Sequence, residues 1–150
     1  MLYTRVVEAI ERVRADGTIE QILDEAALTA DLQAALADGI RSVAFAFMHA
    51  YAYPAHEKAA AALATRLGFD YVAASHQVSP LIKIVGRGDT TIADAYLSPI
   101  LRRYVDKVAG ALAALPLSPA SSGERAEAGP SWPAEGEGRG LLDAALAIIQ

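Results

Sequence analysis

The stretch "SVAFAFMHAYAYPAHEK", residues 42–58, joins an almost unbroken apolar run to a cluster of polar side chains. A continuous apolar run that is rich in Val and Phe is typical of a strand covered on both faces, and Pro54 suits the first turn of a helix. The pattern predicts a strand over 40–48 and then a helix that stops at Gly68. The polar cluster should therefore lie at the carboxyl end of a buried strand, where open α/β sheets bind their ligands.

The neighbouring segments predict an α/β fold. "DYVAAS" at 70–75 resembles a second short strand, so strand, helix and strand form a βαβ unit. Upstream, Asp24 can cap an amphipathic helix that Gly39 ends. The dipeptide Asp16-Gly17 is a strong hairpin signal, because both residues tolerate a positive φ, and it predicts an N-terminal hairpin.

The segment that follows the βαβ unit is harder to assign. "PLIKIVGRG" at 80–88 begins with proline and contains two glycines, which indicates an extended edge or loop. Asp89 is then a candidate cap of the next helix. Pro99 should divide that helix into two or kink it, because proline lacks an N–H and disfavours helical geometry in the residue before it.

The composition changes abruptly after residue 115. Residues 116–140 are rich in Pro, Gly, Ser and Glu, a composition that predicts a low-complexity linker or disordered tail. The last ten residues, "LLDAALAIIQ", are an apolar tail with the composition of a short helix that is unstable alone. We therefore predict a partial domain over 1–115, followed by a linker and a short apolar tail over 116–150.

Composition limits the classes of partner. The chain has 53% hydrophobic residues and a formal net charge of −5, which argues against nucleic acid and anionic membranes as partners, since both reward a basic surface. There are no cysteines, so thiolate chemistry and thiolate metal sites are excluded. No segment has the roughly 20 apolar residues of a membrane helix. A cytoplasmic location is the expectation.

The first candidate site consists of three histidines and a glutamate. His49 lies at the end of the predicted strand, His56 and Glu57 lie in the first turn of the next helix, and His76 follows the second strand. Imidazoles gathered at one sheet edge would suit acid–base or metal chemistry. The alternative, which the sequence favours, is a hydrogen-bonded core histidine, a solvated helix residue and a turn residue, because the spacing matches no closed metal motif. We expect no tight zinc site here.

The second candidate site consists of Arg87, Asp89 and Thr90, placed at an expected helix N-terminus where an anion or a substrate could meet backbone donors. Ordinary capping by Asp89 beside an exposed arginine is the alternative. The glycines at 136–140 follow no strand and do not resemble a phosphate loop. No G-x-S-x-G motif supports triad-type acyl transfer.

Three ordered blocks carry a resemblance to a known family: "FMHAYAYPAHE", "LGFDYVAASHQVSP" and "IVGRGDTTIADAYLSPILRRYV". Over residues 2–114 they resemble the N-terminal region of the hydantoinase A and 5-oxoprolinase family, and most closely that of the ATP-dependent 5-oxoprolinases. The resemblance implies a scaffold similar to the actin-like ATPases. It also implies ATP and a divalent cation (Mg) in the complete enzyme, which opens 5-oxoproline or a hydantoin. The residues that match family blocks are His49, Tyr51, His56, Glu57, Arg87, Asp89, Thr90, Asp94 and Tyr96, without a defined catalytic role for any of them.

The sequence also departs from the family pattern. The family opens with a glycine-rich phosphate-binding hairpin of the type G-x-D-x-G-G-T-F-T-D, which this chain lacks. After residue 115 the family continues into a strand and a Ser/Asn-Gly-Gly segment, and then into a large catalytic domain. We therefore expect a fragment of an ATP-dependent cyclic-amide hydrolase that is inactive alone and needs no cofactor by itself.

Two alternatives remain open. One is a non-catalytic interaction module that docks on a homologous or partner subunit. A weaker one is a free-standing, metal-dependent amide hydrolase that uses the three histidines. The expected partners are the missing enzyme segments or a homologous subunit, and a small cyclic amide in the complete enzyme. Because opening strands would be missing, Val43, Phe45 and Phe47 should be uncovered, and the chain should self-associate.

Overall fold

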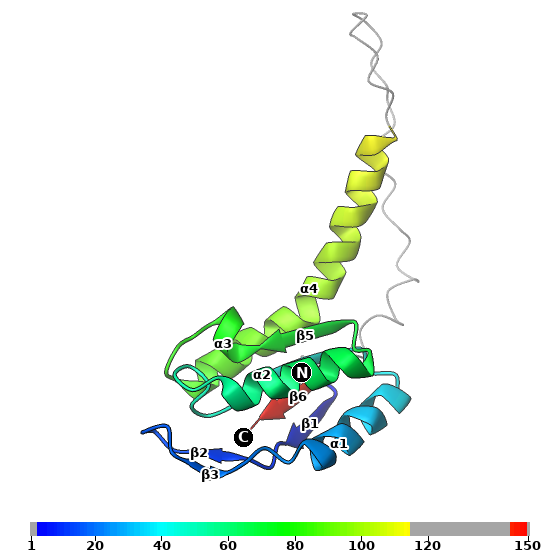
Figure 1. Ribbon diagram of the computed structural model, residues 1–150. Coiled ribbons are helices and arrows are strands. Elements are labelled where there is room, and N and C mark those ends of the chain that lie inside the picture. Colours follow the sequence, from blue (N-terminus) through cyan, green and yellow to red (C-terminus); the bar gives the residue numbers. More distant parts are fainter. Residues whose placement is uncertain (1–2, 115–144, 150) are drawn as a thin grey trace, which may run out of the picture.

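The computed structural model describes residues 3–114 and 145–149 of the 150-residue chain. The fold is a mixed α/β arrangement built on a four-stranded sheet (Figure 1). All neighbouring pairs in this sheet are parallel. In spatial order its strands are β1 (Arg5–Glu8), β6 (Ala145–Ile149), β4 (Ser42–Ala46) and β5 (Tyr71–Ala74).

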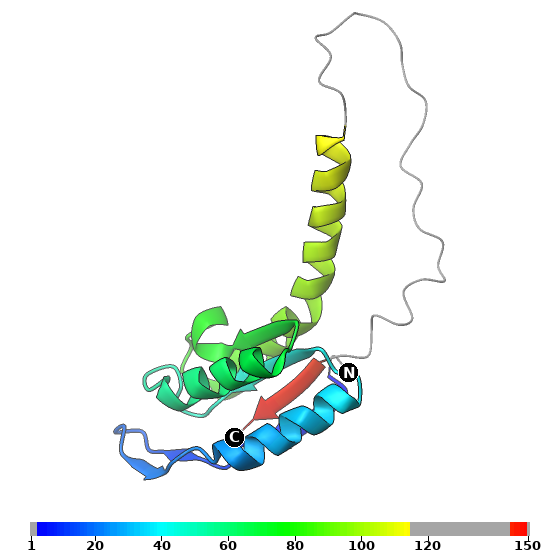
Figure 2. The same ribbon diagram turned by 45° about the vertical axis from the view of Figure 1, so that its right-hand side comes forward.

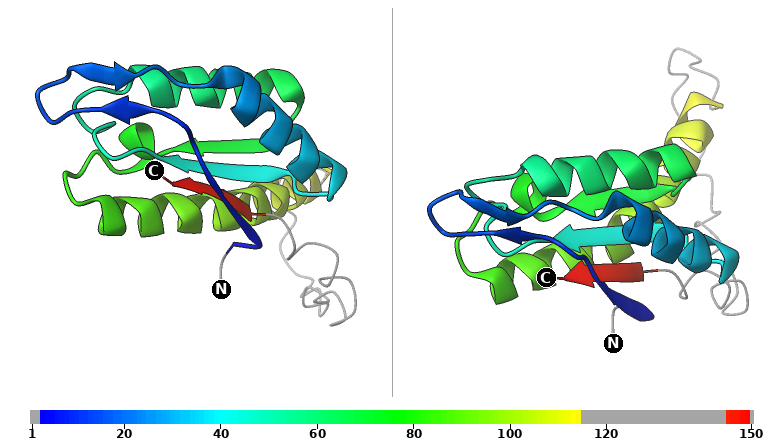
Figure 3. Two further views of the ribbon diagram at one scale, coloured as in Figure 1. Left: turned by 90° about the horizontal axis from the view of Figure 1, so that it is seen from below. Right: turned by 60° about the horizontal axis from the view of Figure 1, so that its bottom comes forward.

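Helices cover both faces of the sheet. Helices α1 (Glu25–Ala37) and α2 (Ala55–Leu67) lie on one face, and the first half of α4 (Ile84–Ala113) lies on the other (Figure 3). The main core lies between the sheet and the first two helices, and a smaller core lies beneath α4. Every residue of β4 is buried, as expected for a strand covered on both faces. The prediction of this strand is confirmed. The prediction of the βαβ unit formed by β4, α2 and β5 is also confirmed.

The helix boundaries follow the predicted signals. The Asp24 side chain accepts hydrogen bonds from the backbone N–H groups of Ala26 and Ala27, so it caps α1. Gly39 follows this helix with φ +86°, and Gly68 ends α2 with φ +97°. Glycine suits both positions because a side chain is strained in the left-handed region.

The hairpin at Asp16-Gly17 is confirmed as the antiparallel pair of β2 (Arg12–Val13) and β3 (Ile19–Gln21). Gly17 has φ +87° at the turn, and the Asp16 side chain accepts a hydrogen bond from Thr18 N at 2.9 Å. That bond lowers the pKa of Asp16.

The expectation of an extended segment over 80–88 is wrong beyond residue 83, because α4 begins at Ile84. Asp89 therefore lies inside the helix and does not cap it. The glycines at 86 and 88 are poor helix formers. Between them, however, Arg87 forms three hydrogen bonds to backbone carbonyls of other segments. These tertiary contacts hold this turn of α4 in place.

Pro99 lies inside α4 and does not divide it into two helices. The helix changes direction in its middle part, as expected for a proline kink (Figures 1 and 2). Its second half stands away from the sheet, and residues 101–113 are all exposed.

The prediction of a helix in the last ten residues is wrong for 145–149, which form the parallel strand β6 between β1 and β4. Ala147 is paired with Val6 on one side and with Ala44 on the other. A short isolated helix is unstable in water, whereas this strand gains two hydrogen-bonded neighbours.

The expected exposure of the face of β4 is wrong, because α1 and α2 pack against it in the main core. Val43, Phe45 and Phe47 were expected to be uncovered, but they are 0%, 0% and 2% exposed. The expected linker over 116–140 lies outside the described residues, and the domain boundary at 115 stays a prediction. Within the described part of the chain, no helix combines the length and apolarity required to cross a membrane.

Candidate functional site

The polar cluster occupies the carboxyl edge of the sheet between β4 and β5. The chain leaves β4 toward α2 on one face, and it leaves β5 through the short helix α3 (Ser75–Val78) toward α4 on the other face. Neighbouring strands whose connections go to opposite faces form the crevice in which open α/β sheets usually bind ligands.

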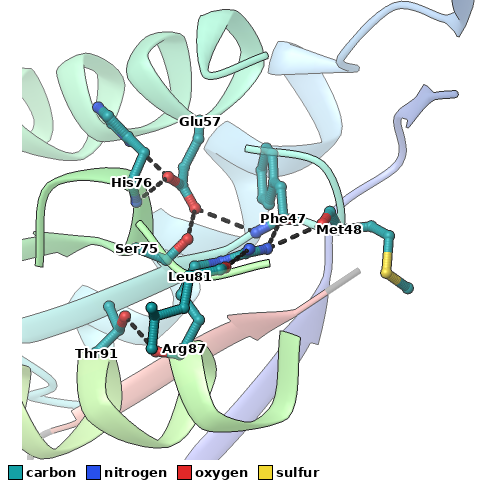
Figure 4. A network of polar contacts seen from close by, with 8 residues as sticks. All are labelled: Phe47, Met48, Glu57, Ser75, His76, Leu81, Arg87 and Thr91. Atoms are coloured by element: carbon teal, nitrogen blue, oxygen red, sulfur yellow. Dashed lines mark hydrogen bonds and ion pairs between the residues drawn. The ribbon is translucent and has the colours of Figure 1, made fainter. Parts of the chain in front are cut away.

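A fully buried carboxylate lies at the centre of this crevice (Figure 4). Glu57, in the first turn of α2, is 0% exposed. Its Oε1 accepts hydrogen bonds from Phe47 N at 3.1 Å and from Ser75 Oγ at 2.7 Å. Its Oε2 accepts hydrogen bonds from His76 N at 3.0 Å and from His76 Nδ1 at 2.5 Å. Four hydrogen-bond donors thus converge on this carboxylate at the N-terminal end of α2.

Arg87 supplies the positive charge of the same network and is also 0% exposed. Its guanidinium donates hydrogen bonds to the carbonyl oxygens of Phe47 (2.5 Å), Met48 (2.9 Å) and Leu81 (2.6 Å). Burial lowers the pKa of Arg87, against the raising effects of Glu57 and Tyr51. The guanidinium thus joins the end of β4 to the loop that precedes α4.

Two buried nitrogen atoms of this network have no hydrogen-bond partner among the described residues: His76 Nε2 and Arg87 Nε. His76 Nδ1 faces Glu57 Oε2, so Nε2 is the ring nitrogen that has no hydrogen-bond partner among the described residues. A carboxylate behind an imidazole orients the ring. This pair could serve acid–base chemistry, but Nε2 itself is covered by protein.

The other two histidines attach the hairpin to the loop between β4 and α2. His49 Nδ1 donates to the carbonyl oxygen of Val13 at 2.8 Å. His56 Nδ1 lies 2.5 Å from Glu11 Oε2, with side-chain exposures of 11% and 3%. The three histidines therefore have different partners. Among residues 3–114 and 145–149, no group of three or more His, Cys, Asp or Glu side chains is arranged to hold a metal ion.

Tyr53 completes the attachment of the hairpin. A Cβ atom built on Gly17 would lie 2.6 Å from Cε1 and 2.8 Å from Cζ of the Tyr53 ring, closer than real Cβ contacts. The tip of the hairpin therefore approaches the ring closely because position 17 has no side chain.

Replacing Gly17 with alanine is expected to lower the free energy of unfolding by about 2–5 kcal/mol. Left-handed strain accounts for about 1–2 kcal/mol, and overpacking against the ring adds about 1–3 kcal/mol. Gly39→Ala is the matched control, because Gly39 has nearly the same φ but nothing within 4 Å of its added Cβ. Urea unfolding measures both. Equal losses in the two variants would show that the Tyr53 contact contributes nothing.

The structure does not bring Arg87, Asp89 and Thr90 together. Arg87 faces the sheet edge and is buried, whereas Asp89 and Thr90 are exposed. Thr90 Oγ1 donates to the carbonyl oxygen of Gly86 in its own helix. The helix N-terminus that was expected near these residues lies at Ile84, so the geometric reason for an anion site at 89–90 is removed.

Of the other residues that match family blocks, Asp94 has a defined structural contact. Its carboxylate accepts hydrogen bonds from Tyr71 Oη at 2.8 Å and from Ser98 Oγ at 2.7 Å. Arg102 lies over the Tyr71 ring, 5.1 Å from its centroid. Burial is the main cause that raises the pKa of Tyr71. These contacts fasten the middle of α4 to β5.

Two members of these networks were not among the predicted site residues. Glu11 is buried, and so are Val7, Ala9 and Val13, so that every second residue of this segment faces inward. An acidic residue at an inward-facing position of a period-two pattern indicates a buried partner, so this signal was available. Ser75 follows β5 directly and gave no such signal, because serine is common at strand ends.

Comparison with known proteins agrees with the block resemblance. A family model described as the hydantoinase/oxoprolinase N-terminal region matches residues 1–68. The chain is 38% identical over 89 residues to 5-oxoprolinase of Saccharomyces cerevisiae, a match that covers 59% of this chain and 7% of the relative. Caprolactamase subunit alpha of Pseudomonas jessenii is 34% identical over 98 residues, covering 65% of this chain and 14% of the relative.

Solved structures show the same relationship. The crystal structure of the ATP-dependent caprolactamase from Pseudomonas jessenii matches with a TM-score of 0.67 and 31% identity, over 70% of this chain and 15% of that one. A nucleotide-free acetone carboxylase structure shares the fold, with a TM-score of 0.61 and 22% identity over 70% of this chain and 16% of that one. The chain spans about a tenth of the length of the curated relatives that it matches. Residues 1–68 therefore correspond to the hydantoinase/oxoprolinase N-terminal region.

Proposed function

We propose that this chain is a structural piece of an ATP-dependent cyclic-amide hydrolase of the 5-oxoprolinase or hydantoinase type, and that it is inactive alone. Similarity to a 5-oxoprolinase and to an ATP-dependent caprolactamase supports the reaction class. The small share of those relatives that the chain covers supports the role of a piece, with the bond-breaking groups supplied by other segments.

The structural role is supported by one observation: both oxygens of the Glu57 carboxylate accept hydrogen bonds from groups within the protein. Four hydrogen bonds to Glu57 join α2 to the end of β4 and to α3. A general base must instead lie within hydrogen-bond reach of a substrate proton. Glu57 is 0% exposed, so it is better suited to hold the segments of the sheet edge together.

The residues at this edge do not fit a nucleoside triphosphate with its magnesium ion. The buried cation, Arg87, is bonded to three carbonyl oxygens. The anionic Glu57 lies at the N-terminus of α2, where a phosphate would otherwise meet backbone donors. Binding of ATP and Mg, and a fold of the actin-like ATPase type, are therefore proposed for the complete enzyme.

Calorimetry with Mg-ATP tests this proposal. We expect no heat of binding to the chain, because the described residues offer no cradle of free donors for phosphate. Ring opening of 5-oxoproline and of caprolactam, followed by chromatography, should likewise not exceed the rate without protein. Micromolar affinity for Mg-ATP, or ring opening that depends on ATP, would contradict the role of an inactive piece.

A docking module is the second candidate function. The second half of α4 exposes a row of apolar side chains, among them Leu101 (58%), Val105 (59%) and Leu112 (62%). Exposed apolar rows on a helix are typical of interaction surfaces. This observation favours attachment to further enzyme segments or to a homologous subunit.

A further inference from the structure

A pocket of about 250 Å³ lies between the end of β4 and the first turns of α4. It is separate from the Glu57 network. Figure 4 shows the Met48 side chain directed away from the Arg87 guanidinium, which binds the Met48 carbonyl oxygen. The described residues that line it are Ala46, Met48, Ile84, Val85, Gly88, Asp89 and Ile92.

The rim of the pocket is apolar and open to solvent. Met48 is 43% exposed and Val85 is 72% exposed. The pocket volume lies just below the range of about 300–1,000 Å³ that is typical of small-molecule pockets. A six-membered aliphatic ring with one small substituent is of this size.

Gly88 contributes to the shape of the pocket. Glycine is a poor helix former, and neither Gly86 nor Gly88 has the positive φ that would require it. A Cβ atom on Gly88 would make only an ordinary contact, 3.9 Å from Ala46 Cβ, and one on Gly86 would meet nothing within 4 Å. Gly88 is buried beside Ala46 in the wall of the pocket, so the absence of a side chain at this position keeps the pocket open.

The charge of the lining selects the ligand. Asp89 is the charged residue of the pocket wall, and it forms no ion pair with any described residue. The nearby positive charge of Arg87 is balanced by Glu57 in the buried network. An N–H donor or an ammonium group would therefore be favoured beside Asp89, and a carboxylate would be repelled.

We propose that this pocket binds a small aliphatic molecule that carries an amine, with its ring against Met48 and Ile92 and its nitrogen toward Asp89. Pockets of this type have apolar walls and a few placed polar groups that set orientation. The proposal concerns a site distinct from the Glu57 network and does not depend on the proposed enzymatic role.

Methyl NMR of the full chain tests the site with three probes of one shape: cyclohexylamine, cyclohexanol and cyclohexanecarboxylate. We expect the methyl signals of Met48 and Ile92 to shift on titration with the amine. The amine should bind about tenfold or more tightly than the carboxylate, which corresponds to about 1.4 kcal/mol, and the alcohol should lie between them. No shift of these methyl signals with the amine, or tighter binding of the carboxylate, would overturn the proposal.

Two variants separate the shape of the pocket from its charge. Gly88→Leu should fill the pocket and abolish the shifts, whereas Gly86→Ala, outside the lining, should retain them. Asp89→Asn changes an exposed side chain and should reduce the affinity for the amine to that for the alcohol. Amine binding unchanged by Asp89→Asn would overturn the assignment of the nitrogen even if Gly88→Leu fails to fold.

Discussion

Replacing Glu57 with glutamine is expected to lower the free energy of unfolding by about 3–5 kcal/mol, the usual cost of removing one partner from a buried charged network. Glutamine keeps the shape but places an NH₂ group where one carboxylate oxygen accepted hydrogen bonds. Donors from Phe47, Ser75 and His76 converge on this carboxylate, so at least one buried donor loses its acceptor. The Arg87 guanidinium also loses its nearby negative charge. Urea unfolding followed by circular dichroism measures the change.

Glu25→Gln is the matched control. Glu25 also lies in the first turn of a helix, but it is exposed, so its replacement should change stability by no more than about 0.5 kcal/mol. A loss in Glu57→Gln as small as that in the control would mean that the network contributes little to the fold. The proposed structural role of Glu57 would then have no support.

The parts of the fold that could be predicted from sequence are those with local causes. The cap at Asp24, the glycine stops at Gly39 and Gly68, and the Asp16-Gly17 turn each depend on the φ angle or side chain of one residue. The burial of β4 was predictable because a strand covered on both faces requires an unbroken apolar run.

The parts that could not be predicted depend on contacts between distant segments. Helix α4 begins before Gly86 and Gly88, where Arg87 binds carbonyl groups about forty residues upstream. Strand β6 forms because β1 and β4 provide two hydrogen-bonding edges for a segment whose own composition resembled a short helix. The helix and strand propensities of the local sequence do not report either of these long-range interactions.

The candidate site was predicted in location but not in arrangement. The carboxyl edge beside β4 does contain His49, His56, Glu57 and His76. Glu57 and His76 bond to each other, whereas the other two histidines bond to Val13 and Glu11. Spacing along the chain placed them at one edge of the sheet. The directions of the side chains depend on Glu11, Val13 and Ser75, which come from other elements.

Replacing Ala147 with proline is expected to destabilise the sheet by about 3 kcal/mol or more. Proline removes a backbone donor and is confined to the edges of sheets, whereas Ala147 lies in a strand with hydrogen-bonded neighbours on both sides. Its ladder partners are Val6 in β1 and Ala44 in β4. Displacement of β6 would therefore expose the hydrogen-bonding edges of two strands at once. The buried strand β4 would lose its neighbouring strand along one edge.

Ala147→Gly is the control, because it keeps the N–H group and should cost only about 0.5–1 kcal/mol. Light scattering across a concentration series gives the second measurement. An uncovered β4 edge favours pairing with another chain, so Ala147→Pro should self-associate at concentrations at which Ala147→Gly behaves like the unmodified chain. Identical association of all three proteins would contradict the role of β6 as cover for β4. Association of the chain would then require another cause, and the apolar row on the second half of α4 is the surface that could provide it.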